Sequence, residues 1–164
     1  MSSIKKIKKI TNLKRKIVCL TAYSKPLAKI LDKHCDIILM GDSVATAFYG
    51  MKNTREIKLD TMINHAISVR KSVKKSLLVF DMPFNTYRNI KEAKKNVKKV
   101  LLRTNCDAIK LESNGKNFKI LKTLTKSGIK VMGHIGYTPQ YKKKFKIEGK
   151  TKHEAQKLLK EAKL

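Results

Sequence analysis

Residues 77–83 read L-L-V-F-D-M-P, a short apolar run that ends in the acid Asp81. The same pattern occurs in I-I-L-M-G-D-S (residues 37–43) and in A-I-K-L-E (residues 108–112). Short apolar runs separated by longer amphipathic stretches are typical of alternating strands and helices around a parallel sheet. The sequence therefore predicts an α/β protein with three of its acids at strand ends.

The remaining elements follow from hydrophobic spacing and from residues that begin or end helices. Pro26 is expected in a first helical turn and Gly128 just after a last one, while Asp60 and Thr151 are candidate N-caps. The expected strands are residues 17–20, 37–40, 77–80, 108–111 and 129–132, and the expected helices are about 26–33, 60–73, 91–103, 116–126 and 152–163. These five βα units form either an open sheet or the first part of a (β/α)8 barrel, which typically has ~250 residues.

The three strand-end acids, Asp42, Asp81 and Glu112, suggest a metal site. The carboxyl ends of parallel strands converge on one rim, where α/β proteins carry their active sites. Converging carboxylates are suitable ligands for a hard divalent cation such as Mg²⁺. Each acid alone could be a helix N-cap or an isolated surface residue, but their shared position favours a site.

Composition is that of one globular domain. The chain has 164 residues, of which 41% are hydrophobic, and no apolar run approaches the ~20 residues of a membrane span. The basic N-terminus lacks the apolar region and cleavage site of a secretory signal. We expect a single cytoplasmic domain over residues 1–164, with residues 1–15 as a basic N-terminal extension. Cys19, Cys35 and Cys106 lack C-x-x-C spacing and are expected to be buried free thiols.

The net charge of +27 raises the possibility of nucleic-acid binding. However, the 39 basic residues are 34 Lys and 5 Arg, and specific base and phosphate recognition relies on the planar arginine fork. The lysines recur on the polar faces of the expected helices. We therefore expect weak attraction to polyanions at low salt but no specific nucleic-acid partner and no membrane partner.

Several motifs, in order, resemble those of the ketopantoate hydroxymethyltransferase family. They are L-T-A-Y (20–23), I-I-L-M-G-D-S (37–43), M-I-N-H-A-I-S-V-R (62–70), D-M-P-F-N-T-Y (81–87), D-A-I-K-L-E (107–112) and G-I-K-V-M-G-H-I-G-Y-T-P-Q (128–140). The resemblance implies a (β/α)8 TIM barrel, of which this chain holds the first five βα units while the C-terminal units are missing.

The resemblance also implies a reaction: transfer of a hydroxymethyl group from 5,10-methylenetetrahydrofolate to 3-methyl-2-oxobutanoate, giving 2-dehydropantoate in pantothenate and coenzyme A biosynthesis. It implies that Mg²⁺ is held by Asp42, Asp81 and Glu112, and that the keto acid is bound by Asp42, Ser43, Asp81, Lys110 and His134. Less specific interpretations remain. Lys110 could pair with Glu112, His134 could be structural, and Ser43 could cap the next segment. His65 and Arg70 are interpreted as structural, and His34 and His153 as surface residues.

The chain departs from the family at its end. The family's catalytic base lies beyond the fifth unit, so the resemblance places it beyond Leu164. An arc of five strands would expose two strand edges and an apolar inner face. We therefore expect a homo-oligomer or a complementing C-terminal fragment as partner. The alternatives are a catalytically inactive fragment or an assembly module.

Overall fold

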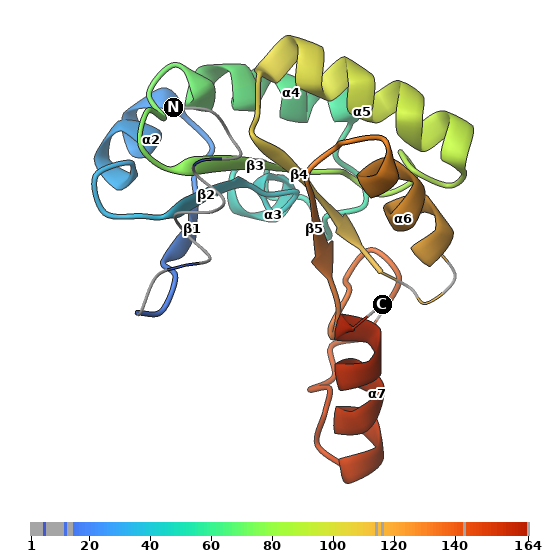
Figure 1. Ribbon diagram of the computed structural model, residues 1–164. Helices are drawn as coiled ribbons and strands as arrows, with labels where there is room; N and C mark the ends of the chain where they lie inside the picture. Colours follow the sequence, from blue (N-terminus) through green and yellow to red (C-terminus); the bar gives the residue numbers. More distant parts are fainter. Residues whose placement is uncertain are drawn as a thin grey trace.

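A computed structural model describes residues 5, 12, 15–113, 115, 117–142 and 144–163, so most of the expected basic extension lies outside the described residues. Its centre is a five-stranded parallel sheet in which the strand order β1-β2-β3-β4-β5 follows the chain order (Figure 1). The strands are β1 (Cys19–Thr21), β2 (Ile37–Met40), β3 (Leu77–Asp81), β4 (Ala108–Glu112) and β5 (Val131–His134).

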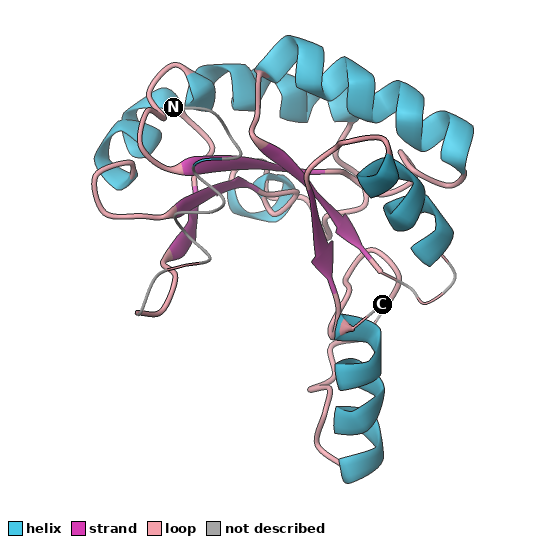
Figure 2. Cartoon of the chain, in the orientation of Figure 1, coloured by secondary structure: helices cyan, strands magenta, loops and turns pink. Residues whose placement is uncertain are grey.

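Helices connect the strands, and most of them lie side by side over one face of the curved sheet (Figures 1 and 2). They are α2 (Lys25–Leu31), α3 (Val44–Ala47), α4 (Leu59–Arg70), α5 (Ile90–Thr104), α6 (Phe118–Lys126) and α7 (Lys152–Ala162). Consecutive parallel strands joined by helices are successive βα units of a (β/α)8 barrel, because right-handed crossovers place each helix on the same outer face. The predicted fold class is confirmed.

The sheet has an apolar core on each face. Alternate residues of the strands, such as Ile38 and Phe80, are fully buried against the helices. On the inner face Ile37, Leu77 and Val79 are buried in a second, smaller cluster. The expectation of a broadly exposed inner face is therefore wrong for the middle strands, because neighbouring side chains on the curved sheet cover one another.

The first strand is the exposed part of the sheet. β1 has three residues, all exposed, and Leu20 keeps 48% of its surface accessible. Cys19 lies in this strand and is exposed, whereas Cys35 and Cys106 are buried. The prediction of buried thiols is therefore wrong for Cys19, because among the described residues β1 is an edge strand that pairs only with β2.

Two strand boundaries and one cap differ from the predictions. β1 and β5 both lie two residues later than expected at their first residue. An apolar run does not show where a strand begins: residues 129 and 130 precede β5, although the Lys130 carbonyl already accepts a hydrogen bond from Ile109 of β4 at 3.0 Å. Asp60 is not the N-cap of α4: Lys58 occupies that position, and Asp60 lies in the first turn, 2.6 Å from the ammonium of Lys99.

Other helix signals are confirmed. Gly128 follows α6 with φ +82, a left-handed conformation suited to glycine. Thr151 caps α7 in a capping box with Glu154. No residue of α7 is buried, and this helix stands apart from those that cover the sheet (Figure 1). Within the described residues, no helix has the length and apolar character to cross a membrane.

Candidate active site

Three buried acids lie at the carboxyl ends of neighbouring strands. Asp81 is the last residue of β3, Glu112 is the last residue of β4, and Asp42 lies two residues after β2. Their exposed fractions are 2%, 1% and 5%. The backbone nitrogen of Asp42 lies 3.5 Å from Asp81 Oδ2. The parallel strands thus bring the acids predicted from the sequence to one edge of the sheet.

Asp81 forms an ion pair with Lys110, the residue beside it on β4. Lys110 Nζ donates to Asp81 Oδ2 at 2.7 Å, so Lys110 is paired with Asp81 and not with Glu112. Asp81 Oδ1 is buried and has no hydrogen-bond partner in the described part of the chain. Burial raises the pKa of Asp81 to about 7, although the charge of Lys110 opposes this shift.

Asp42 is held from the loop that follows β5. Gln140 Nε2 donates to Asp42 Oδ2 at 2.9 Å. Burial raises the pKa of Asp42, while the hydrogen bond from Gln140 and the charge of Lys110 act in the opposite direction. The carboxylates of Asp42 and Asp81 are therefore both desolvated, and a cation would stabilise their ionised forms.

Glu112 anchors the same loop. Its Oε2 accepts a hydrogen bond from the backbone nitrogen of Gln140 at 3.0 Å, and its Oε1 lies 3.5 Å from His134 Nδ1. The His134 side chain is 30% exposed at the edge of the site. Its Nδ1 has no hydrogen-bond partner among the described residues. A purely structural histidine would be expected to have one.

Ser43 faces a tyrosine from the first βα unit. Its Oγ lies 2.8 Å from the hydroxyl of Tyr23, and it makes no side-chain cap hydrogen bond to α3. Ser43 therefore occupies the N-cap position of α3, as the capping alternative expects, but its side chain does not make the capping bond. His65 contacts the Tyr23 backbone oxygen at 2.7 Å, and Arg70 pairs with Asp107 at 3.1 Å, so both make the structural contacts expected of them.

Two further residues of the site, Gln140 and Tyr87, have no role predicted from the sequence. Both are buried, and the Tyr87 hydroxyl donates to Gln140 Oε1. Tyr87 ends the motif D-M-P-F-N-T-Y and Gln140 ends the motif G-H-I-G-Y-T-P-Q. Their places in these motifs are the sequence feature that could have indicated a role in the site. Their contacts depend on how two loops fold over the strand ends, which the strand pattern does not show.

The donor set suits Mg²⁺ in part. Asp42 and Asp81 offer hard carboxylate oxygens, and Asp81 Oδ1 is buried without a partner. Across the described ranges no group of three or more His, Cys, Asp or Glu side chains could hold a metal ion by itself. Mg²⁺ commonly uses only one or two protein carboxylates, with water and substrate oxygens completing its coordination. Two carboxylates are therefore a sufficient protein contribution.

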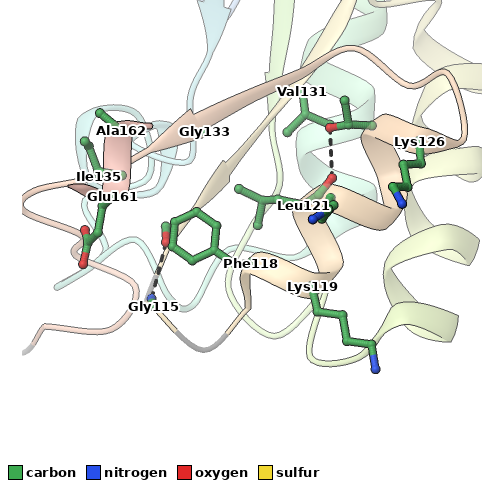
Figure 3. Close-up of a pocket in the computed structure, with 13 residues that line it drawn as sticks. Gly115, Phe118, Lys119, Leu121, Lys126, Val131, Gly133, Ile135, Glu161 and Ala162 are labelled. Atoms are coloured by element: carbon green, nitrogen blue, oxygen red, sulfur yellow. Dashed lines mark hydrogen bonds between the residues drawn. The ribbon is translucent and has the colours of Figure 1, made fainter. Parts of the chain in front are cut away.

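A cavity of about 970 Å³ lies elsewhere, between α6, β5 and the end of α7 (Figure 3). Its apolar wall includes Phe118, Leu121 and Val131, and its rim carries lysines and Glu161. None of the predicted site residues lines it. The chemistry of the strand-end carboxylates therefore belongs to a different part of the molecule.

Comparison of the whole sequence with known protein families gives a match along the full chain. The family described as ketopantoate hydroxymethyltransferase matches residues 1–164. The chain belongs to this family. The resemblance drawn from its motifs is thereby confirmed.

Curated relatives give the extent of the match. The chain is 51% identical to 3-methyl-2-oxobutanoate hydroxymethyltransferase of Pelagibacter ubique (strain HTCC1062) over 162 residues, covering 96% of this chain and 63% of the relative. It is 44% identical to the enzyme of the same name from Rhizobium etli, covering 89% of this chain and 55% of the relative. The chain thus spans little more than half the length of these relatives.

Solved structures share the fold at low identity. Oxaloacetate acetylhydrolase in complex with 3,3-difluorooxalacetate matches with a TM-score of 0.61 and 16% identity, over 80% of this chain and 52% of that one. A phosphonopyruvate hydrolase complex with oxalate and Mg²⁺ matches with a TM-score of 0.58 and 14% identity, over 68% and 39%. These matches support the barrel architecture alone.

Proposed function

We propose that this chain carries the metal-binding and keto-acid-binding part of a 3-methyl-2-oxobutanoate hydroxymethyltransferase, in which 5,10-methylenetetrahydrofolate is the one-carbon donor. The observation that carries the proposal is the buried Asp81, with one oxygen on Lys110 and the other without a partner. The names of the relatives supply the substrate and the reaction class. We propose that residues 1–164 act as a single domain.

The proposed metal ligands are Asp42 and Asp81, with Glu112 adding negative charge close by. When bound, Mg²⁺ would supply Lewis-acid polarisation of the carboxylate and carbonyl oxygens of the keto acid. Glu112 already accepts a hydrogen bond from the backbone of Gln140. We therefore propose that Glu112, the third predicted metal ligand, acts on the metal mainly through its negative charge and by holding the loop that carries Gln140.

The cationic and polar groups of the site bind the keto acid. Lys110, whose side chain is 12% exposed, presents a positive charge to the anion that develops when the C3 proton leaves. Ser43 and His134 lie at the accessible edge of the site and are proposed to donate to the substrate carboxylate. The residue that removes the C3 proton is not assigned to a position in this chain.

Proton exchange at C3 of 3-methyl-2-oxobutanoate in D₂O, followed by NMR, tests the proposal without the folate. We expect exchange that requires Mg²⁺ and is lost in Asp81→Asn. Asp60→Asn is the matched control, because the Asp60 side chain is 62% exposed and lies in the first turn of α4. A folded wild-type chain that shows neither this exchange nor Mg²⁺-dependent binding of the keto acid contradicts the proposal.

A second candidate is an assembly role that depends on a partner. The exposed β1 edge, with Leu20 48% accessible, favours it. The partner would be a second copy of the chain or a segment that supplies further βα units. Light scattering of the purified chain distinguishes these cases: a monomer that lacks C3 exchange, and gains it with an added C-terminal segment of a relative, identifies complementation.

A further inference from the structure

We propose that Gln140 is a positioning residue that fixes the Asp42 carboxylate, and that Tyr87 sets the orientation of the Gln140 amide. This inference rests on the proposed function, because it assigns Asp42 to the metal and keto-acid site. It concerns a residue that reaches Asp42 from the loop after β5.

Every polar group of the Gln140 side chain has a partner. Nε2 donates to Asp42 Oδ2 at 2.9 Å and to the backbone oxygen of Met82 at 3.0 Å, and Oε1 accepts from the Tyr87 hydroxyl. The backbone nitrogen of Gln140 donates to Glu112. Gln140 is only 1% exposed. One buried residue therefore connects segments that follow β2 and β3 with the last residue of β4.

The orientation of the amide is determined by its neighbours. Rotating the amide by half a turn would place Oε1 against Asp42 Oδ2 and the Met82 backbone oxygen, which are both acceptors. Burial raises the pKa of Tyr87, so its hydroxyl keeps its proton and remains a donor to Oε1. The two acceptors thus direct the nitrogen of the amide toward Asp42, and the hydrogen bond from Tyr87 to Oε1 supports the same orientation.

The consequence is a carboxylate pair whose orientation is set before any ligand arrives. Gln140 binds one oxygen of Asp42, and Lys110 binds one oxygen of Asp81. The second oxygen of Asp81 has no partner within the described residues. Groups that orient metal ligands in this way typically change metal affinity by about 10–100-fold when they are replaced.

Three variants separate positioning from folding. Gln140→Glu keeps the size of the side chain but replaces the donor with an acceptor facing Asp42. Tyr87→Phe keeps the ring and removes the hydroxyl that orients the amide. Gln156→Glu is the matched control, since it makes the same chemical change at an exposed position of α7. Thermal unfolding of each variant shows whether it remains folded.

The first measurement is ¹⁵N NMR of the side-chain amides of the full chain. We expect the Gln140 NH₂ signals, identified by their loss in Gln140→Glu, to exchange with solvent at least about tenfold more slowly than those of Gln156. Tyr87→Phe should remove most of this protection. Exchange of Gln140 as fast as that of Gln156 overturns the inference, whatever the metal does.

The second measurement is Mg²⁺ titration by calorimetry with 3-methyl-2-oxobutanoate present. We expect the affinity for Mg²⁺ to fall at least about tenfold in folded Gln140→Glu, less in Tyr87→Phe, and not at all in Gln156→Glu. Unchanged affinity in Gln140→Glu overturns the positioning role. A wild-type chain that does not bind Mg²⁺ overturns the proposed function instead, and the amide-exchange result then decides whether Gln140 holds Asp42 as the structure shows.

Discussion

The buried Asp81 predicts how the stability of the metal-free protein changes with pH. Its pKa is raised from 3.8 to about 7, chiefly by burial. An acid with a higher pKa in the folded state binds its proton more tightly there than in the unfolded chain. Protonated Asp81 therefore favours the folded state below pH 3.8, and this contribution is lost as the pH rises through about 7.

The size of the effect follows from the shift. A change of about three pKa units corresponds to an upper limit of about 4 kcal/mol, at ~1.4 kcal/mol per unit. About 3 kcal/mol of this falls between pH 5 and pH 8. Asp42 has a pKa shifted in the same direction for the same reason, so its contribution adds to the trend without reversing it.

Urea unfolding at pH 5 and pH 8 in the presence of EDTA, followed by circular dichroism, measures this change. We expect the unfolding free energy of the wild type to fall more than that of Asp81→Asn, by up to about 3 kcal/mol. Asp81→Asn also leaves Lys110 without its partner, but this cost is present at both pH values and does not enter the difference. Mg²⁺ added at pH 8 should stabilise the wild type and not the variant.

The difference between the wild type and Asp81→Asn decides whether the pKa of Asp81 is raised. Equal loss of stability in the wild type and in Asp81→Asn would mean that Asp81 titrates near its ordinary pKa in the folded chain. Burial would then not raise the pKa of Asp81 in the folded chain. A wild type that becomes more stable between pH 5 and pH 8, relative to the variant, would reverse the sign and refute it more strongly.

Two further predictions concern stability away from the site. Asp32→Ala should lower the unfolding free energy by about 2 kcal/mol in urea titrations, because the Asp32 carboxylate accepts hydrogen bonds from the backbone nitrogens of Lys74, Lys75 and Ser76; an unchanged midpoint would show that these bonds contribute nothing. Thr151→Ala should weaken α7 by about 1 kcal/mol. Hydrogen exchange should then accelerate in α7 and remain unchanged in the sheet, whereas acceleration throughout the protein would contradict the separation of α7 from the core.

The fold could be predicted from the sequence because each strand and helix has a local sequence pattern of its own. The apolar runs at residues 37–40, 77–80 and 108–111 predicted β2, β3 and β4 to within one residue at their ends. The outer strands were placed less well. In β1 and β5 the apolar residues extend beyond the paired segment, so only the neighbouring strand determines where pairing begins.

The candidate site could be predicted where it follows from strand position, as for Asp42, Asp81 and Glu112. The hydrogen-bond and ion-pair partners of the site residues could not be predicted. Lys110 and Glu112 are two residues apart and share one face of β4. Only the pairing of β3 with β4 places Lys110 beside Asp81. Gln140 was missed for a similar reason, since its contact with Asp42 joins residues 98 positions apart through a loop whose course has no periodic pattern.

The strand order has a consequence for how the molecule is assembled. Each strand pairs with the one that precedes it in the chain, so during synthesis every new βα unit finds its neighbour already made. The sheet can therefore grow stepwise from its first strand. The bond between Gln140 and Asp42 can form only after the fifth strand is in place. The acids of the early strands are thus assembled long before the residue that orients them.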